Sequence, residues 1–495
     1  MVFFTIVAFL HWYVIPFLVP EKRRLLFLHV FLLLASYTFY MSWEWQFGFL
    51  LAFTTVMDYT AARVLDWLDE GENPEKEKYR RYIIAASVVM NLGVLAYFKY
   101  TDFFISSFID LINTLHPGSF NREQRDSLLL NLILPLGISF FTFHSMNYTI
   151  DVFRRVQKAE RSLLRFAIYV AFFPVLLAGP IITAREFLPQ LRILPALDLD
   201  RVKKSARWFL LGYFKKAVLA DNMAPIVDTI YRNVDQYGAA GHWLGAFGFW
   251  VQVYCDFSGY SDMAWGSAMF LGYSLPENFR MPYLSRSVTE HWQRWHISLI
   301  KWIRDYLYIP LGGNRVSYFR HKVNVFLTMF LAGIWHGANW TFAIWGGIHG
   351  IILAIESAVS AFFEKRFPVE RRPSFLRLFV YPGNALRFVY TTFVTVFFGT
   401  IFRSANIHES VLILKRMAFL DQTPGLDISP SMYRTVMYGV LAVYIGHILG
   451  YFLFEKKVLS FKVPVWVETS FYPLSVLLLI QFGAADTAPF IYFVF

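Results

Sequence analysis

The chain has 495 residues, of which 56% are hydrophobic and 16% are charged, whereas about 25% are charged in a typical soluble protein. This composition excludes a soluble globular enzyme and a disordered chain, and a single cysteine excludes a scaffold of internal disulfides. The net charge of +11 fits the Lys and Arg that gather in cytoplasmic loops of membrane proteins, so it does not indicate a nucleic-acid partner. We expect an all-α, polytopic membrane protein in contact with the lipid bilayer.

The first apolar run, Val2–Val19, lacks a basic leading region and a small-residue cleavage site, so we expect a retained span rather than a signal peptide. Further apolar runs follow along the chain, and several are shorter than the roughly 17 residues that cross a bilayer. Such runs suggest tilted, re-entrant or broken helices. We expect one integral membrane domain over residues 1–495, with about eleven to thirteen transmembrane helices and further re-entrant or interfacial helices.

Aromatic and ionisable residues are concentrated in one region of the chain. Six of the fifteen Trp fall between Trp292 and Trp345, and five of the twelve His fall between Tyr254 and His349. Ionisable groups at membrane depth are costly unless they pair or line a wet cavity, which makes them candidates for function. Asp256 and Asp262 lie six residues apart around Gly259, and this pattern suggests a bent or broken helix. The two carboxylates form either the polar wall of a cavity or bridges between neighbouring helices.

A second stretch has an aromatic stripe at steps of three and four residues. The stripe consists of Trp292, Trp295, Leu299, Trp302, Ile303 and Tyr306. This spacing predicts an amphipathic helix at the membrane interface, which Pro310 and Gly312-Gly313 end in a turn. Taken alone, such a helix is more often a surface anchor than a catalytic element.

A third stretch places His336 inside an apolar span among small residues, with Asn339 on the same helical face. A histidine there can be a neutral base near pH 7, or a buried side chain bonded to a neighbouring helix. Several familiar sites are absent from the sequence: a nucleophile elbow around Ser258, a zinc-binding His-Glu-x-x-His and a phosphate loop at Gly312–Arg315. These absences disfavour a serine hydrolase, a metalloprotease and a nucleotide-driven pump.

Several separated motifs keep the order that is found in one protein family. The motifs are Pro135–Phe140, Ala178–Ile181, Phe187–Leu191, Asp256–Asp262, Trp295–Leu299, Arg304–Arg315 and Trp335–Ala338. Together they resemble the membrane-bound O-acyltransferase (MBOAT) family, in particular its bacterial alginate O-acetyltransferase branch. The resemblance covers about residues 132–350, and the flanking spans are similar only in their apolar character.

The resemblance implies a ring of tilted helices around a funnel through the membrane. The acyl donor would enter from the cytoplasmic side and the acceptor from the other side. The family's characteristic histidine falls on His336, and the second histidine of the bacterial branch falls on His296. The sequence departs from the family's pattern at Glu290-His291, where relatives more often carry an apolar or aromatic residue. The role of His291 therefore stays open.

The activity implied by the resemblance is transfer of an acetyl or short acyl group to a hydroxyl outside the bacterial cytoplasmic (inner) membrane. The donor would be acetyl-CoA or an acyl-phosphopantetheine carrier protein, used as a substrate, with no permanently bound cofactor and no metal. The acceptor would be an exported polysaccharide, as in alginate biosynthesis, or a hydroxyl of a periplasmic partner acetyltransferase. His336 would act as general base, and His296 would orient the acceptor or stabilise the oxyanion.

The resemblance also gives other residues supporting roles. Those expected to line the substrate tunnel are Asp256, Ser258, Asp262, Trp295, Trp335 and Asn339. Arg304, Asp305 and Arg315 are expected to hold the interfacial helix at the tunnel mouth. Cationic side chains that suit the phosphates of coenzyme A or of a carrier protein, and equally lipid headgroups, are Lys301, Arg315, Arg320 and Lys322.

Two alternatives come from other functional classes. A transporter or flippase would use His336 and Asp256 as a proton relay, but such proteins normally contain paired half-sequences, and none is visible. A non-catalytic scaffold would recruit the enzymes of a cell-envelope acetylation complex. The sequence leaves the acceptor, the acyl chain length and the oligomeric state open.

Overall fold

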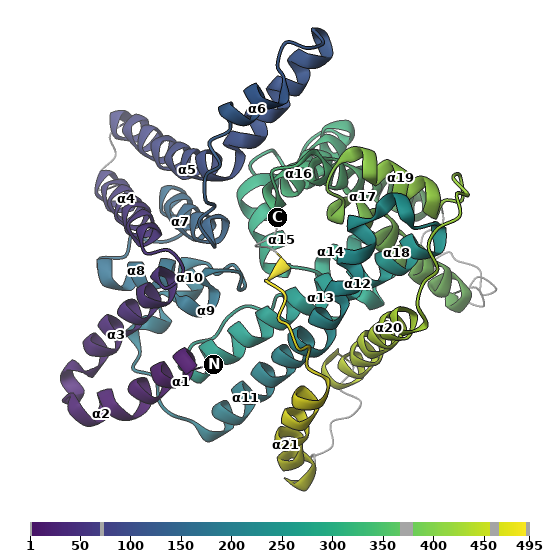
Figure 1. Ribbon diagram of the computed structural model, residues 1–495. Helices are drawn as coiled ribbons and strands as arrows, with labels where there is room; N and C mark the ends of the chain where they lie inside the picture. Colours follow the sequence, from purple (N-terminus) through teal and green to yellow (C-terminus); the bar gives the residue numbers. More distant parts are fainter. Residues whose placement is uncertain (1, 70–73, 367–379, 456–464, 492–495) are drawn as a thin grey trace. The chain divides into compact units, whose positions relative to one another are not determined.

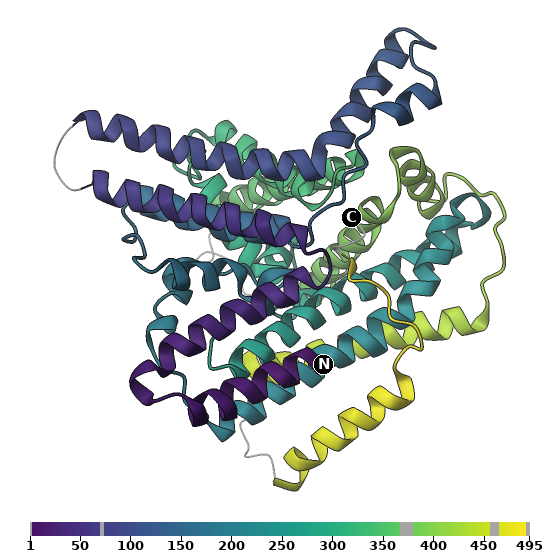
Figure 2. The ribbon, with the colours of Figure 1, turned by 60° about the vertical axis from the view of Figure 1, so that its left-hand side comes forward.

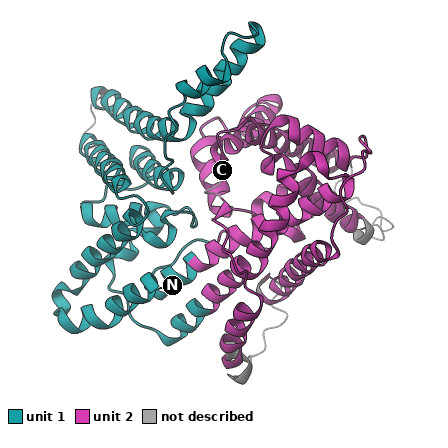
Figure 3. Ribbon diagram, in the orientation of Figure 1, with its two compact units in different colours: residues 1–206, 264–276 teal, residues 207–263, 277–495 magenta. Residues whose placement is uncertain are grey.

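The computed structural model describes residues 2–69, 74–366, 380–455 and 465–491 (Figure 1). Within these ranges the regular secondary structure is helical, with no strand, so the all-α prediction is confirmed. The chain divides into two compact units, residues 1–206 with 264–276 and residues 207–263 with 277–495 (Figure 3). The expected core, residues 132–350, has members in both units, and its assignment to a single domain stays a prediction.

The first unit is a group of helices held together by buried polar contacts as well as apolar packing. Its helices are α1 (Val2–Phe9), η1 (Leu10–Val14), α2 (Ile15–Leu18), α3 (Glu21–Met41), α4 (Gln46–Leu68), α5 (Pro74–Leu115), α6 (Arg122–Leu128), α7 (Ile138–Phe153), α8 (Leu163–Ala171), α9 (Phe173–Leu176), α10 (Ala184–Phe187) and η2 (Gln190–Arg192). α4 packs against α5, α7 and α8 (Figure 2, purple to blue). Asp58 on α4 is fully buried, and its carboxylate accepts hydrogen bonds from Ser87 Oγ at 2.7 Å and Asn91 Nδ2 at 2.9 Å on α5. These bonds offset the desolvation of the carboxylate and fix how α4 and α5 meet.

The second unit contains most of the other helices. They are η3 (Lys215–Ala220), α12 (Asp221–Arg232), η4 (Val234–Gln236), η5 (Pro282–Leu284), α14 (Val288–Arg294), α15 (Ile297–Ile303), η6 (Arg304–Tyr308), α16 (Tyr318–His336), α17 (Trp340–Arg366), α18 (Val380–Arg403), α19 (Ile407–Met417), α20 (Pro430–Gly450), η9 (Tyr451–Glu455) and α21 (Val465–Phe482). Two further helices, α11 (Leu199–Phe214) and α13 (Ala239–Phe270), have residues in both units. α16 and α17 form an antiparallel pair, α18 packs on α17, and α14 contacts both α17 and α18.

Five helices among the described residues are long and apolar enough to cross a membrane. These are Glu21–Met41, Glu75–Leu115, Trp340–Phe363, Gly383–Arg403 and Pro430–Leu453. Shorter apolar helices at Val2–Leu18 and Thr469–Phe482 accompany them. The protein is therefore a multi-pass membrane protein. The larger expected number of crossings depends on shorter or interrupted helices and stays a prediction, as do the ring and the funnel.

Two local expectations, a break in the helix at Gly259 and a single amphipathic helix, are wrong, whereas a bend at Gly259 stays a prediction. α13 is helical through Gly259, where the sequence suggests a possible break. The glycine instead allows a close helix contact, because a Cβ there would lie 2.7 Å from the carbonyl oxygen of Gly212 on α11. The expected single amphipathic helix is interrupted, since α14 ends at Arg294, α15 begins at Ile297 and His296 between them has φ 46°.

The aromatic stripe also differs from a surface anchor. Trp292, Trp295 and Trp302 are each less than 9% exposed. Trp292 and Trp295 belong to the apolar core of the second unit. Aromatic side chains bury large areas and dominate core energetics, so this stripe holds α14 and α15 inside the protein.

Candidate active site

Small residues let α16 and α17 approach closely, and this contact positions the end of α16. A Cβ at Gly333 would lie 3.0 Å from the Cα of Gly346, and a Cβ at Gly346 would lie 2.9 Å from the Cα of Gly333. Any side chain at either position would collide with the opposite backbone. The glycine pair therefore brings the side chains of His336 and Trp345 into contact.

His336 is the last residue of α16 and is 5% exposed. Its ring lies edge-on to three aromatic rings, with centroid distances of 5.0 Å to Trp335, 5.6 Å to Trp345 and 5.3 Å to Phe402. These contacts restrict the orientation of the imidazole. His336 also lies beside the partial negative charge of the helix C-terminus.

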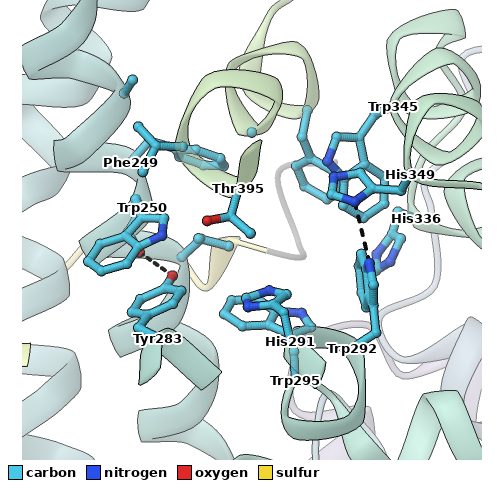
Figure 4. A pocket seen from close by; sticks show the side chains of 15 residues that line it. Phe249, Trp250, Tyr283, His291, Trp292, Trp295, His336, Trp345, His349 and Thr395 are labelled. Carbon is cyan, nitrogen blue, oxygen red and sulfur yellow. Dashed lines mark hydrogen bonds between the residues drawn. The ribbon is translucent and has the colours of Figure 1, made fainter. Parts of the chain in front are cut away.

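The ring of His336 forms part of the wall of a pocket in the second unit (Figure 4). The pocket holds about 590 Å³ of space that protein atoms do not occupy, part of it open to the surroundings. Its wall consists of Ala246, Phe249, Trp250, Val253, Tyr283, His291, Trp292, Trp295, His336, Trp345, His349, Thr395, Val396, Gly399 and Phe402. A mainly aromatic wall with a few imidazoles suits a ligand that combines apolar surface with a reacting polar group.

Hydrogen bonds fix several of the wall side chains (Figure 4). Trp292 Nε1 donates to Nδ1 of His349 at 3.3 Å. The hydroxyl of Tyr283 donates to the carbonyl oxygen of Trp250 at 2.7 Å, and the two rings stack with centroids 3.4 Å apart. His291 Nδ1 lies 3.3 Å from the carbonyl oxygen of Pro282, so it is the protonated nitrogen of that ring. The pocket is thus largely preformed.

Comparison with known proteins identifies the family. The model of the MBOAT, membrane-bound O-acyltransferase, family matches residues 31–398. The chain belongs to this family.

Several curated members of the family are similar to this chain over most of its length. A protein of Azotobacter vinelandii named probable alginate O-acetylase AlgI is 38% identical over 435 residues, which cover 86% of this chain and 81% of the relative. Its namesake in Pseudomonas aeruginosa is 38% identical over 438 residues, covering 88% and 79%. The peptidoglycan O-acetyltransferase of Helicobacter pylori is 32% identical over 445 residues, covering 84% and 78%. The chain is an O-acyltransferase.

The structure brings some of the sequence-predicted site residues of the acyltransferase together. His336 and Trp295 both line the pocket. His296 is fully buried outside the pocket wall. Trp335 contacts both histidines, with its ring centroid 6.4 Å from that of His296 and 5.0 Å from that of His336. These four residues form one cluster, and their catalytic roles stay predictions.

The carboxylates of α13 are held in ion pairs away from the pocket wall. Asp256 Oδ1 lies 2.6 Å from Lys216 Nζ, and Asp262 Oδ2 lies 2.6 Å from Lys215 Nζ. Ser258 is fully buried on the same helix. The carboxylates thus bridge neighbouring helices, as in the second of the two readings of their sequence. The two lysines were not predicted, although an adjacent lysine pair inside an apolar run is a recognisable signal.

The remaining predicted residues lie apart from the pocket wall. Asn339 donates through Nδ2 to the carbonyl oxygen of Ala405 at 2.7 Å. Arg304 pairs with Asp305, with Nε 2.8 Å from Oδ1. Arg315 and Arg320 are exposed, whereas Lys322 Nζ donates to Ser357 Oγ at 2.7 Å.

Sequence reasoning missed most of the pocket wall. Phe402 and Thr395 come from α18, which carries no motif, and Trp250 and Phe249 come from the apolar first half of α13. His349 and Trp345 lie beside the glycines of α17, and that combination is the one signal that could have found them. Among the described residues, no group of three or more His, Cys, Asp or Glu is arranged to hold a metal ion.

Proposed function

We propose that this acyltransferase moves an acetyl or other short acyl group from a thioester on the cytoplasmic side of the membrane to a hydroxyl on the outer side. The hydroxyl oxygen attacks the thioester carbonyl, the carbon–sulfur bond breaks, and an ester and a free thiol result. The observation that carries the proposal is the position of His336, whose imidazole lies on the wall of the aromatic pocket at the C-terminal end of α16.

His336 acts as the general base in this proposal. It takes the proton of the attacking hydroxyl, and the imidazolium that results can protonate the leaving thiolate. General base catalysis of this kind contributes about 10² to 10⁴ in rate. The helix C-terminus carries partial negative charge beside His336, and the wall of the pocket around it is mainly aromatic.

The donor and acceptor follow from chemistry and from the names of the relatives. The donor is acetyl-CoA or an acyl-phosphopantetheine carrier protein, both of which present a thioester. The acceptor is an exported polysaccharide or a hydroxyl of a periplasmic partner transferase, in line with relatives named for alginate and peptidoglycan acetylation. We propose that the enzyme lies in the bacterial inner membrane, where a cytoplasmic donor and an exported acceptor can both reach it. Exposed Arg315 and Arg320 are proposed to attract the donor's phosphates.

The proposal is tested by measuring acetate that base releases from cell-envelope polysaccharide. The wild type, a deletion strain and the deletion strain carrying His336→Ala or His408→Ala are compared at equal protein level. His408 is exposed on α19 and serves as the matched control. We expect acetate to fall to the deletion level with His336→Ala and to stay at the wild-type level with His408→Ala.

Other outcomes point to different functions. Full acetate with His336→Ala, together with loss in the deletion, would indicate scaffolding or transport and would overturn the role of His336 as base. Unchanged acetate in the deletion would overturn acetyl transfer to this acceptor, and the same strains would then be analysed for ester-linked D-alanine or longer acyl groups.

A further inference from the structure

His296 occupies a strained and enclosed position between α14 and α15. Its backbone has φ 46° and ψ 51°, a left-handed conformation that is strained for a residue with a Cβ. The side chain is 0% exposed, and its ring lies edge-on to Phe257 at a centroid distance of 4.6 Å. Strain of this kind persists only where the surrounding structure holds the residue in place.

Asn278 holds one edge of the His296 ring. Its Oδ1 lies 3.0 Å from His296 Nδ1 and also accepts hydrogen bonds from Ser298 Oγ at 2.8 Å and from the backbone N–H of Ser298 at 3.4 Å. A backbone N–H can only donate, so the Asn278 atom that faces it is the oxygen. The amide nitrogen of Asn278 then donates to Ser261 Oγ at 3.0 Å. The network therefore fixes which way the amide points.

This orientation determines the tautomer of His296. The amide oxygen of Asn278 carries no proton, so the hydrogen bond requires the imidazole proton to be on Nδ1. The neutral ring has one N–H, which leaves a lone pair on Nε2. Nε2 is buried and has no hydrogen-bond partner among the described residues. A buried nitrogen that could accept a hydrogen bond but has no donor is unfavourable, and a bound ligand that donates to Nε2 removes this cost.

We infer that Asn278 is a positioning residue of the acyl transfer, which keeps the proton of His296 on Nδ1 so that Nε2 accepts a hydrogen bond from an acceptor that extends past the pocket wall to the His296 side of Trp335. The inference rests on the proposed function. A neutral His296 in this tautomer has no N–H left for an oxyanion, so its role is to orient the acceptor. The reacting hydroxyl gives its single proton to His336. Nε2 therefore accepts a hydrogen bond from a second group of the acyl acceptor, which on a sugar is a neighbouring hydroxyl.

The surroundings of His296 make its protonation easy to interpret. The rings that pack on it belong to Phe257, Phe279 and Trp335, which carry no charge. Among the described residues, His336 is the titratable group that interacts electrostatically with it. A carboxylate introduced at position 278 would stabilise the protonated ring of His296. The neutral ring, whose Nε2 can accept a hydrogen bond, would then form only at higher pH.

The experiment compares Asn278→Ala, Asn278→Asp and the control His408→Ala in membrane vesicles from the deletion strain that carries each variant. Labelled acetyl-CoA is the donor, and unacetylated envelope polysaccharide from the deletion strain is the acceptor. Asn278→Ala should reduce transfer about tenfold or more, because the wrong tautomer is populated. Asn278→Asp should restore most of the activity and move the acid limb of the pH–rate profile to higher pH. Exposed His408 on α19 lies outside this network, so His408→Ala should change the rate less than about twofold.

A second measurement tests the tautomer without any catalysis. The ¹⁵N spectrum of the wild type labelled in histidine distinguishes protonated from unprotonated ring nitrogens, and His296→Asn identifies the signals of His296. We expect a protonated Nδ1 and an unprotonated Nε2 in the wild type, and a mixture of tautomers in Asn278→Ala. A protonated Nε2 in the wild type overturns the inference even if transfer is observed.

The two measurements separate the inference from the proposed function. If Asn278→Asp is as inactive as Asn278→Ala, or if its acid limb does not move, Asn278 has only a structural role and the inference fails. If the wild type transfers no acetyl groups, the proposed function fails, and if His336→Ala transfers them as fast as the wild type, the role of His336 as base fails; in both cases the ¹⁵N spectrum still decides the tautomer.

Discussion

Lys216 and Asp256 form an ion pair between η3 and α13, with Nζ 2.6 Å from Oδ1. Lys216 also contacts Asp221 Oδ1 at 2.8 Å and donates to the carbonyl oxygen of Ala488 at 2.9 Å. The second oxygen of Asp256 accepts the backbone N–H of Ile491 at 2.7 Å. One lysine thus pairs with two carboxylates and, with Asp256, holds the C-terminal segment on α13, where Phe490 packs against Phe257.

Replacement of this lysine should destabilise the second unit strongly. Lys216→Met removes the single cation shared by Asp221 and Asp256 and leaves two carboxylates, each 2% exposed, without it. Breaking a buried pair in this way typically costs about 3–5 kcal/mol. Asp256→Asn should destabilise the protein less, because Lys216 still pairs with Asp221. Thermal unfolding of the purified protein in detergent measures both variants, and equal midpoints for Lys216→Met and the wild type would contradict the shared-cation arrangement.

The contact between α11 and α13 depends on the absence of side chains. A Cβ at Gly212 would lie 2.8 Å from the backbone nitrogen of Met263 and closer still to the carbonyl oxygen of Gly259. Backbone atoms cannot move aside as a flexible side chain can, so Gly212→Ala should destabilise the protein by about 1–3 kcal/mol. Gly446→Ala on α20 is the control, because a Cβ there meets no atom within 4 Å. A melting temperature of Gly212→Ala equal to that of Gly446→Ala would count against this contact.

Filling the pocket should block transfer without harm to the fold. Gly399 lines the pocket, and a Cβ at this position meets no atom within 4 Å. Gly399→Leu therefore places its side chain in free space and should reduce acyl transfer about tenfold or more, a loss of roughly 1.4 kcal/mol. Gly383→Leu on the same helix also meets free space but lies outside the pocket wall, so it should keep wild-type activity. Similar transfer rates in the two variants would show that the acceptor and donor do not use this pocket.

Lowering the pH should weaken the contacts that Glu160 makes with Arg165 and Arg192 in the first unit. Glu160 lies in the loop between α7 and α8, outside the candidate spans. Burial alone would raise the pKa of Glu160, but hydrogen bonds from Arg165, Ser162 and Arg192 outweigh it and lower the pKa below 4.5. The contact thus stabilises the fold fully above about pH 4.5, and its contribution is lost as the pH falls through the lower, folded-state pKa.

The variant Glu160→Gln tests this dependence. Its melting temperature should lie below that of the wild type at neutral pH, and the two should converge as the pH is lowered. A difference that stays constant down to pH values well below 4.5 would show that the charge of Glu160 is not responsible.

The sequence predicts the helical class, the membrane setting and the family, because these depend on composition and on ordered motifs. It also singles out His336 and Trp295, which the structure places on one pocket wall. It does not predict the break at His296, since a left-handed residue leaves the three- and four-residue spacing of the aromatic stripe almost intact. It also misses Phe402 and Trp250, because an apolar residue that faces a pocket is indistinguishable in sequence from one that faces lipid. Partners such as Asn278 are found only once distant segments meet.

The left-handed backbone of His296 also costs the fold stability that another residue at this position would keep. Glycine would adopt this conformation without strain, and asparagine tolerates it well, so either would relieve the backbone there while removing the imidazole. A chain with glycine or asparagine at position 296 can therefore keep its fold, so folding alone does not report whether the imidazole is needed for transfer.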